Sequence, residues 1–281
     1  MHVSHFFSPI LFAALTSLLT LQPAFTPVAS ASSPPHMVMF SAWDHGFDGP
    51  DTIRAGQTTI RLHNRGHEPH QLQLLKLENG KSPADLAVVL QNEGQAIPSW
   101  AKHMGGPNGV GSGEKADATI YLEPGTYVVI CVIPGKNRKT HAALGMQKIL
   151  HVTENRRSQP EFHGSFHMAM LDFEFVVVEP LRRGDHTFYV VNRGSQPHQI
   201  SLVKLNPGAS PAEVRASFEP GKLSSLPGQL IGGMSALEPG AEGTFTAALS
   251  PGRYAMICLF PNPTAHDSHA AKGMVMKFSI E

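Results

Sequence analysis

Two segments of the chain carry a thiol, an imidazole and a thioether at short and nearly equal spacing. The first reads CVIPGKNRKTHAALGM and runs from Cys131 through His141 to Met146. The second reads CLFPNPTAHDSHAAKGM and runs from Cys258 to Met274. These segments contain the only two cysteines of the chain. A thiolate, an imidazole and a thioether together favour a soft or borderline metal ion, above all copper.

A second imidazole is available to each segment. His70 in NRGHEPHQLQL and His198 in NRGSQPHQISL each follow an Asn-Arg-Gly turn and a proline, at the expected entry to a strand. Two imidazoles, a thiolate and a weak axial thioether form the ligand set of a trigonal copper site suited to electron transfer. The predicted metal ligands are His70, Cys131, His141 and Met146 in the first half and His198, Cys258, His269 and Met274 in the second.

The two halves of the chain resemble each other at an offset of about 128 residues. LHNRGHEPHQLQLLKL in the first half returns as VVNRGSQPHQISLVKL, and EPGTYVVIC returns as SPGRYAMIC. HMVM at 36–39 is also matched by HMAM at 167–170. The sequence therefore predicts two tandem domains, at 36–153 and 165–281, joined by a polar linker at 154–164.

Most of each half has the pattern of short strands joined by turns. Residues 58–62 and 72–74 alternate apolar and polar side chains, which predicts half-buried strands. Residues 127–132 are apolar on both faces and predict an interior strand. Serine, proline and an acid at N3 in SPAD (82–85) and SPAE (210–213) predict one short helix in each half. The predicted fold class is all-β, with two tandem β-sandwich domains that each contain a short inserted helix.

The ligand order resembles that of the cupredoxins, the blue copper proteins and domains. It consists of a histidine, then Gly-x-Tyr-x-x-x-Cys, then His-x-x-x-x-Met, and it occurs once in each half. The resemblance implies two Greek-key β-sandwiches, each with a type 1 copper under the loop from Cys to Met, so up to two coppers per chain. It also implies single-electron transfer, with the cysteine as the electron path, the histidines as equatorial ligands with one exposed edge, and the methionine as the axial ligand.

Three alternatives stay open at this point. Cys131 and Cys258 could form a disulfide, which would require their Cα atoms to lie within about 7 Å of each other. The domains could instead serve as a copper-handling or metal-free binding module without a redox role, because a fold does not establish a function. His266 competes with His269 as a ligand, and the His-x-x-x-x-Met spacing shared by both halves favours His269.

Other histidines and methionines are expected to be structural. His67 and His103 have no histidine counterpart in the other half, so both are predicted to lie at the surface. A further group at the first strand of each half is predicted to pack in an ordinary way and not to form an auxiliary Cu(I) site. It comprises His36, Met37, Met39, His167, Met168 and Met170.

The residues next to the cysteines predict that the protein is not an enzyme. Multicopper oxidases and copper nitrite reductases use histidines beside the blue-copper cysteine to hold a second copper centre. Here the neighbours are Ile130, Val132, Ile257 and Leu259. No nucleophile–base motif or phosphate-binding glycine loop stands out elsewhere.

Composition and the N-terminus indicate location and partners. Twenty-two basic residues cancel twenty-two acidic ones, so no net field attracts nucleic acid or an anionic membrane. Residues 1–31 resemble a signal peptide for export, with an apolar run from Ile10 to Leu21 and small residues at 29–31. We expect a periplasmic or extracellular protein with a redox partner protein and no membrane span after signal removal. The sequence indicates no oligomeric state.

Overall fold

The computed structural model describes residues 1–2, 35–91, 97–135, 139–155, 162–217, 226–262 and 267–281. Residues 3–31 of the predicted signal peptide, residues 156–161 of the predicted linker and His266 lie outside these ranges. The first half contains β1 (His36–Trp43), β2 (Gly46–Asp48), β3 (Thr52–Arg54), β4 (Gly56–Asn64), β5 (Gln73–Leu77), α1 (Pro83–Gln91), β6 (Ala101–His103), β7 (Lys115–Leu122), β8 (Gly125–Ile130) and β9 (Gln147–Thr153). The second half contains β10 (Phe166–Leu171), β11 (Glu174–Val177), β12 (Gly184–Asn192), β13 (His198–Leu205), α2 (Pro211–Ser217), β14 (Gly228–Leu237), β15 (Glu242–Leu249), β16 (Gly252–Ile257), the 3₁₀ helix η2 (His269–Lys272) and β17 (Val275–Ile280).

The sequence patterns account for the strands and helices that form. β4 alternates buried and half-buried residues along its whole length, as its period of two predicts. β8 is buried on both faces from Tyr127 to Ile130, because Tyr127 and Val129 pack in one hydrophobic cluster and Val128 and Ile130 in another. α1 begins with the expected capping box, in which Ser82 and Asp85 exchange hydrogen bonds between side chain and backbone. Ser210 and Glu213 repeat these bonds at α2.

Three sheets form the β-sandwiches that the sequence predicts. A five-stranded sheet has the order β3-β9-β8-β5-β6 and belongs to the first half. A four-stranded sheet has the order β14-β13-β16-β17 and belongs to the second half. An eight-stranded sheet, β11-β10-β12-β15-β7-β4-β1-β2, contains the other layer of both halves. The all-β, cupredoxin-like fold class is thereby confirmed.

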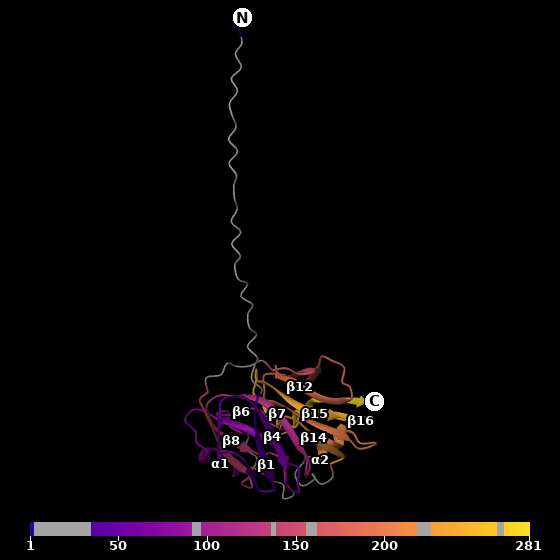
Figure 1. Ribbon diagram of the computed structural model, residues 1–281. Coiled ribbons are helices and arrows are strands. Elements are labelled where there is room, and N and C mark those ends of the chain that lie inside the picture. The colour runs from indigo at the N-terminus through magenta and orange to yellow at the C-terminus, as the bar shows by residue number, and fades with distance from the viewer. Residues whose placement is uncertain (3–34, 92–96, 136–138, 156–161, 218–225, 263–266) are drawn as a thin grey trace. The chain divides into compact units, whose positions relative to one another are not determined.

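The halves meet where β7 of the first pairs antiparallel with β15 of the second, as Figure 1 shows near the middle of the unit. A second contact joins the segments 104–110 and 231–237 through isolated β-bridges. One hydrophobic core cluster contains residues of both halves, among them Ile120 of β7 and Phe245 of β15. Pro34–Glu281 form one compact unit. The boundaries of two separately folding domains stay a prediction, since these contacts do not test whether either half folds alone.

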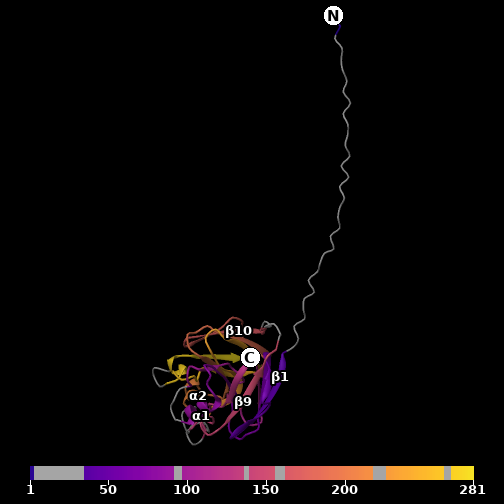
Figure 2. The same cartoon turned by 90° about the vertical axis from the view of Figure 1, so that its left-hand side faces the viewer.

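The matching tetrapeptides HMVM and HMAM occupy different registers. Phe40 of β1 lies opposite Leu62 of β4, whereas Met168 of β10 lies opposite Val190, the residue aligned with Leu62. Relative to the neighbouring strand, HMAM is shifted by three residues from the position of HMVM. A shift by an odd number of residues moves each side chain to the opposite face of the sheet. Met37 and Met39 therefore lie exposed on β1, which runs along one side of the unit in Figure 2, while Met168 is buried.

No helix among the described residues is long and apolar enough to cross a membrane.

Candidate metal centre

Each cysteine directly follows the last residue of an interior strand, and the following loop is folded back onto it. Cys131 comes after β8, and its carbonyl accepts a hydrogen bond from the N–H of Ala142 at 2.7 Å. A further bond in the loop joins the Met146 N–H to the His141 carbonyl at 2.9 Å. Corresponding bonds in the second half run from Ala270 N–H to the Cys258 carbonyl and from Met274 N–H to the His269 carbonyl. The two loops thus return His and Met to their cysteine.

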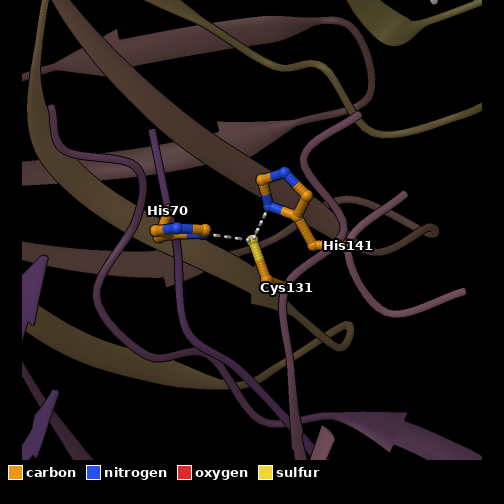
Figure 3. Close-up of side chains that lie close together, drawn as sticks. All are labelled: His70, Cys131 and His141. Atoms are coloured by element: carbon orange, nitrogen blue, oxygen red, sulfur yellow. Dashed lines mark hydrogen bonds between the residues drawn. The ribbon is translucent and has the colours of Figure 1, made fainter. Parts of the chain in front are cut away.

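Centre 1 comprises His70, Cys131, His141 and Met146. The Cys131 Sγ lies 3.4 Å from Nδ1 of His141 and 3.8 Å from Nδ1 of His70. Figure 3 shows both imidazole rings with a nitrogen directed at the sulfur. The ring centroids are 4.7 Å apart. The structure thus brings His70, remote in the chain, next to Cys131 and His141.

Centre 2 comprises His198, Cys258, His269 and Met274. The Cys258 Sγ lies 3.6 Å from Nδ1 of His269 and 4.0 Å from Nδ1 of His198. These two nitrogens are 2.9 Å apart. In both centres the three ligand atoms of the His-Cys-His set lie within 4.8 Å of one another.

A single metal ion fits between these atoms. Metal–nitrogen bonds of about 2.0 Å and metal–sulfur bonds of about 2.3 Å at trigonal angles separate sulfur from nitrogen by about 3.7 Å. The four sulfur–nitrogen distances range from 3.4 to 4.0 Å, so they already match this spacing closely. The nitrogen–nitrogen distance of centre 2 would have to widen, from 2.9 Å to about 3.5 Å.

Burial disfavours the charged forms of both cysteines and of one histidine in each centre. It raises the pKa of Cys131 and of Cys258 to about 12, although backbone N–H bonds oppose this in part. Burial, with the charge of the neighbouring histidine, lowers the pKa of His70 and of His269 to about 4. Neutral imidazole is the form that binds a metal, and the thiolate forms when the ion displaces the thiol proton.

Each loop ends at a methionine, the residue predicted as the fourth ligand. Met146 and Met274 are both fully buried, in the same hydrophobic cluster as the cysteines. Gln71 and Gln199 donate their backbone N–H to the cysteine sulfurs at 3.5 Å, a bond that favours a thiolate. The donors therefore suit copper better than zinc, because a buried thioether adds a soft ligand.

Carboxylates behind the histidines are part of the site that sequence reasoning missed. Asp44 Oδ1 lies 3.2 Å from Nε2 of His70, and Asp172 Oδ1 lies 2.9 Å from Nε2 of His198. Burial would raise the pKa of both carboxyls, but hydrogen bonds from their neighbours outweigh it and lower the pKa. Each bond leaves Nδ1 free for the metal. Asp44 and Asp172 share the repeat offset, which was the available signal.

The glycine of each Asn-Arg-Gly turn permits this contact. A Cβ on Gly66 would lie 2.3 Å from Oδ1 of Asp44 and 2.7 Å from Nε2 of His70. A Cβ on Gly194 would meet Asp172 and the His198 ring in the same way. No real Cβ approaches other atoms so closely, so only glycine leaves room for the carboxylate–imidazole pair.

Of the remaining predictions about cysteines, histidines and methionines, some are confirmed and some are wrong. Both cysteines are free, which excludes the Cys131–Cys258 disulfide. His67 is exposed as predicted, but His103 is buried because its ring packs on Phe260 and pairs with Glu238. His141 and His269 are also buried, so the predicted exposed ligand edge does not occur. Met168 and Met170 pack in the core as expected, whereas Met37 and Met39 do not.

No protein-family model matches the chain, and no curated protein matches it. Solved structures do match. Reduced auracyanin from Roseiflexus castenholzii is 20% identical, with 42% of this chain and 96% of that chain covered and a TM-score of 0.31. Auracyanin A from Chloroflexus aurantiacus, described as a "blue" copper protein, is 25% identical, with 42% and 99% covered and a TM-score of 0.30. The fold is cupredoxin-like. These structure neighbours are cupredoxins, and the cupredoxin-like halves contain two His-Cys-His sets that fit up to two coppers.

Two longer matches correct one prediction. A multicopper oxidase is 10% identical, with 87% of this chain and 88% of that chain covered and a TM-score of 0.25. A copper-containing nitrite reductase from Thermus scotoductus is 12% identical, with 87% and 61% covered and a TM-score of 0.23. Because cupredoxin-like structures thus include enzymes, the prediction that the chain is not an enzyme is wrong. The residues beside Cys131 and Cys258 do not establish a non-catalytic role.

Proposed function

We propose that this chain is an exported copper protein that holds up to two type 1 copper ions and transfers single electrons between redox partner proteins. One observation carries the proposal: a buried thiol lies 3.4–4.0 Å from two imidazole nitrogens in each half, on a loop that ends at a buried methionine. A bound copper ion would supply one-electron chemistry by cycling between Cu(II) and Cu(I).

The side chains of each centre have separate roles in this proposal. Cys131 and Cys258 would bind as thiolates and provide the electron path, with their negative charge stabilised by the backbone N–H bonds. The histidines would bind through Nδ1, which is the nitrogen that faces the sulfur. Met146 and Met274 would be weak axial ligands that also exclude water.

Electrons would enter each centre through the side chains that cover it. His141 is 2% exposed and His269 is fully buried, so a partner protein would not touch either imidazole directly. Glu68 is bonded to His141, and Phe173 and Phe260 pack against the ring of His269. These covers define the two surfaces on which a redox partner would dock.

The location and the domain plan belong to the same proposal. Residues 1–31 would direct export, because they combine an apolar run with small residues before a cleavage point. Residues 36–153 and 165–281 would be repeated domains joined at 154–164, as the sequence offset indicates.

Copper loading tests the proposal. Metal-free protein is reconstituted with Cu(II), and its copper content, visible spectrum and redox behaviour are measured. We expect two coppers per chain, an intense visible thiolate-to-Cu(II) band and reversible one-electron cycling. A colourless protein that binds only Cu(I) would favour copper handling, and a protein without copper would favour a binding module.

A further inference from the structure

The two centres differ in the hydrogen bond made by the histidine of the Cys-to-Met loop. We propose that this difference sets their reduction potentials apart, so that centre 2 has the higher potential and the first electron taken up by the protein resides there. Glu68 and the aligned residue Gln196 are the positioning residues responsible. This inference rests on the proposed function, because it concerns copper bound at these same centres.

In centre 1 each histidine has a carboxylate partner. Oε2 of Glu68 lies 2.9 Å from Nε2 of His141, and both side chains are largely buried, at 18% and 2% exposed. Asp44 holds the other histidine, His70, through its Nε2. Two negative charges therefore reach the outer nitrogens of both imidazoles.

In the described part of centre 2, only His198 has such a partner. Asp172 accepts from its Nε2 at 2.9 Å. Nε2 of His269 is buried and has no hydrogen-bond partner among the described residues. Its ring lies instead between aromatic rings, with centroids 5.3 Å from Phe173 and 5.6 Å from Phe260. The position aligned with Glu68 holds Gln196, which carries no charge.

One further carboxylate lies close to centre 2. Asp267 precedes His269 by two residues, but its Oδ2 is paired with Nζ of Lys272 at 3.4 Å. Its Oδ1 has no hydrogen-bond partner among the described residues, so it does not accept from Nε2 of His269. Its charge is offset by the lysine, and it makes no bond to the His269 ring of the kind that Glu68 makes to His141.

The sign of the effect follows from charge. A carboxylate that accepts the outer N–H of a ligating imidazole makes the ligand more basic and brings negative charge near the metal. Cu(II) carries one more positive charge than Cu(I), so this charge stabilises Cu(II) and lowers the potential. Aromatic surroundings without such a charge disfavour the more highly charged state and raise it. The carboxylate at His141 and the aromatic rings around His269 therefore both make the potential of centre 2 higher than that of centre 1.

Single-centre variants of the full chain measure each potential separately. Cys258→Ser leaves centre 1 and Cys131→Ser leaves centre 2, and each is titrated by visible spectroscopy against redox mediators. We expect the higher potential in the Cys131→Ser protein. A difference of tenfold in the preference for Cu(II) over Cu(I), at the low end of the effect of outer hydrogen-bond partners, corresponds to about 59 mV.

Exchange of the two aligned residues then assigns the cause. Glu68→Gln in the Cys258→Ser background should raise the potential of centre 1, and Gln196→Glu in the Cys131→Ser background should lower that of centre 2. Glu123→Gln serves as the control, because Glu123 pairs with Lys76 at the other end of β8 and should shift neither potential. Copper content and the visible band show that each variant still holds its metal.

Two results would overturn the inference: equal potentials or a higher one at centre 1, or a Glu68→Gln protein that keeps its copper with an unchanged potential. Failure of the proposed function would look different, because the unsubstituted protein would then bind no copper or show no thiolate-to-Cu(II) band.

Discussion

Pro107 forms an antiparallel β-bridge with Met234, the residue aligned with it in the second half. On either side, Met104 bridges Leu237 and Val110 bridges Ile231. Met104 is aligned with Ile231 and Val110 with Leu237, so these two bridges are equivalent to each other when the halves are interchanged. Contacts of this reciprocal kind are typical of two subunits related by a twofold axis. Here they join two halves of one chain. A fragment that contains only one half would therefore expose the surface that the other half covers in the full chain.

Asn108 tests how strongly this contact holds the halves together. Its Nδ2 donates across the contact to the carbonyls of Ile200 at 2.8 Å and Met234 at 3.2 Å. Asn108→Ala would leave both buried carbonyls without this donor, and we expect a loss of about 1–3 kcal/mol in the free energy of unfolding. Denaturant unfolding of the metal-free full chain measures it. Asn155→Ala, which removes a part-buried bond within the first half, should cost less.

Copper stoichiometry should respond to each cysteine separately. Because each half has its own ligand set, Cys131→Ser should lower bound copper from two ions to one and keep the spectrum of centre 2, with the converse for Cys258→Ser. A serine hydroxyl stays protonated and is a poor ligand for a soft metal. Metal analysis and the visible band provide the measurement. Loss of all copper from either single variant would instead mean one shared site.

Shape-similar replacement should reveal the axial role of the methionines. Met146→Leu or Met274→Leu should keep copper bound but raise the potential of the altered centre, because the apolar side chain no longer donates to Cu(II). Redox titration of each variant checks this. Complete loss of copper from a variant whose circular dichroism is unchanged would contradict an axial position.

Gly66 and Gly194 should each be required for the metal affinity of their centre. In Gly66→Ala the new methyl group would push Asp44 away from His70. Loss of such an outer partner typically costs 10–100-fold in metal affinity, so we expect about that weakening at centre 1. Competition with a copper chelator measures the affinity. Gly46→Ala is the matched control, since a Cβ there meets nothing within 4 Å, and an equal loss in both variants would refute the steric explanation.

Acid should weaken the protein partly through Glu238. Burial raises the pKa of this carboxyl, but hydrogen bonds from the ring and backbone N–H of His103 outweigh burial and lower the pKa below the ordinary 4.5. The stabilisation is therefore present above pH 4.5 and lost as the pH falls through the lowered value. At pH 7 the metal-free unsubstituted chain should have a larger free energy of unfolding than the Glu238→Gln variant. This difference in free energy should become smaller as the pH falls. A difference that is constant with pH would contradict this.

Sequence alone determined the helices and strands and the members of the two His-Cys-His clusters. These features show as patterns along the chain: the period of two in the strands, the Ser-Pro starts of the helices, and the recurrence of His, Cys, His and Met. Such patterns can be recognised from the sequence without a structure. They placed Cys131 at the end of an interior strand and joined it to His70 and His141, because neighbouring strands bring such positions together.

Tertiary structure decided the contacts that cross between elements. The bonds of Asp44 to His70 and Glu68 to His141 depend on where separate loops meet, which spacing along the chain does not specify. The burial of His103 depends on the second half, since Phe260 and Glu238 cover it. The exposure of Met37 was likewise settled by strand register, because a shift by an odd number of residues moves a side chain from the core to the surface.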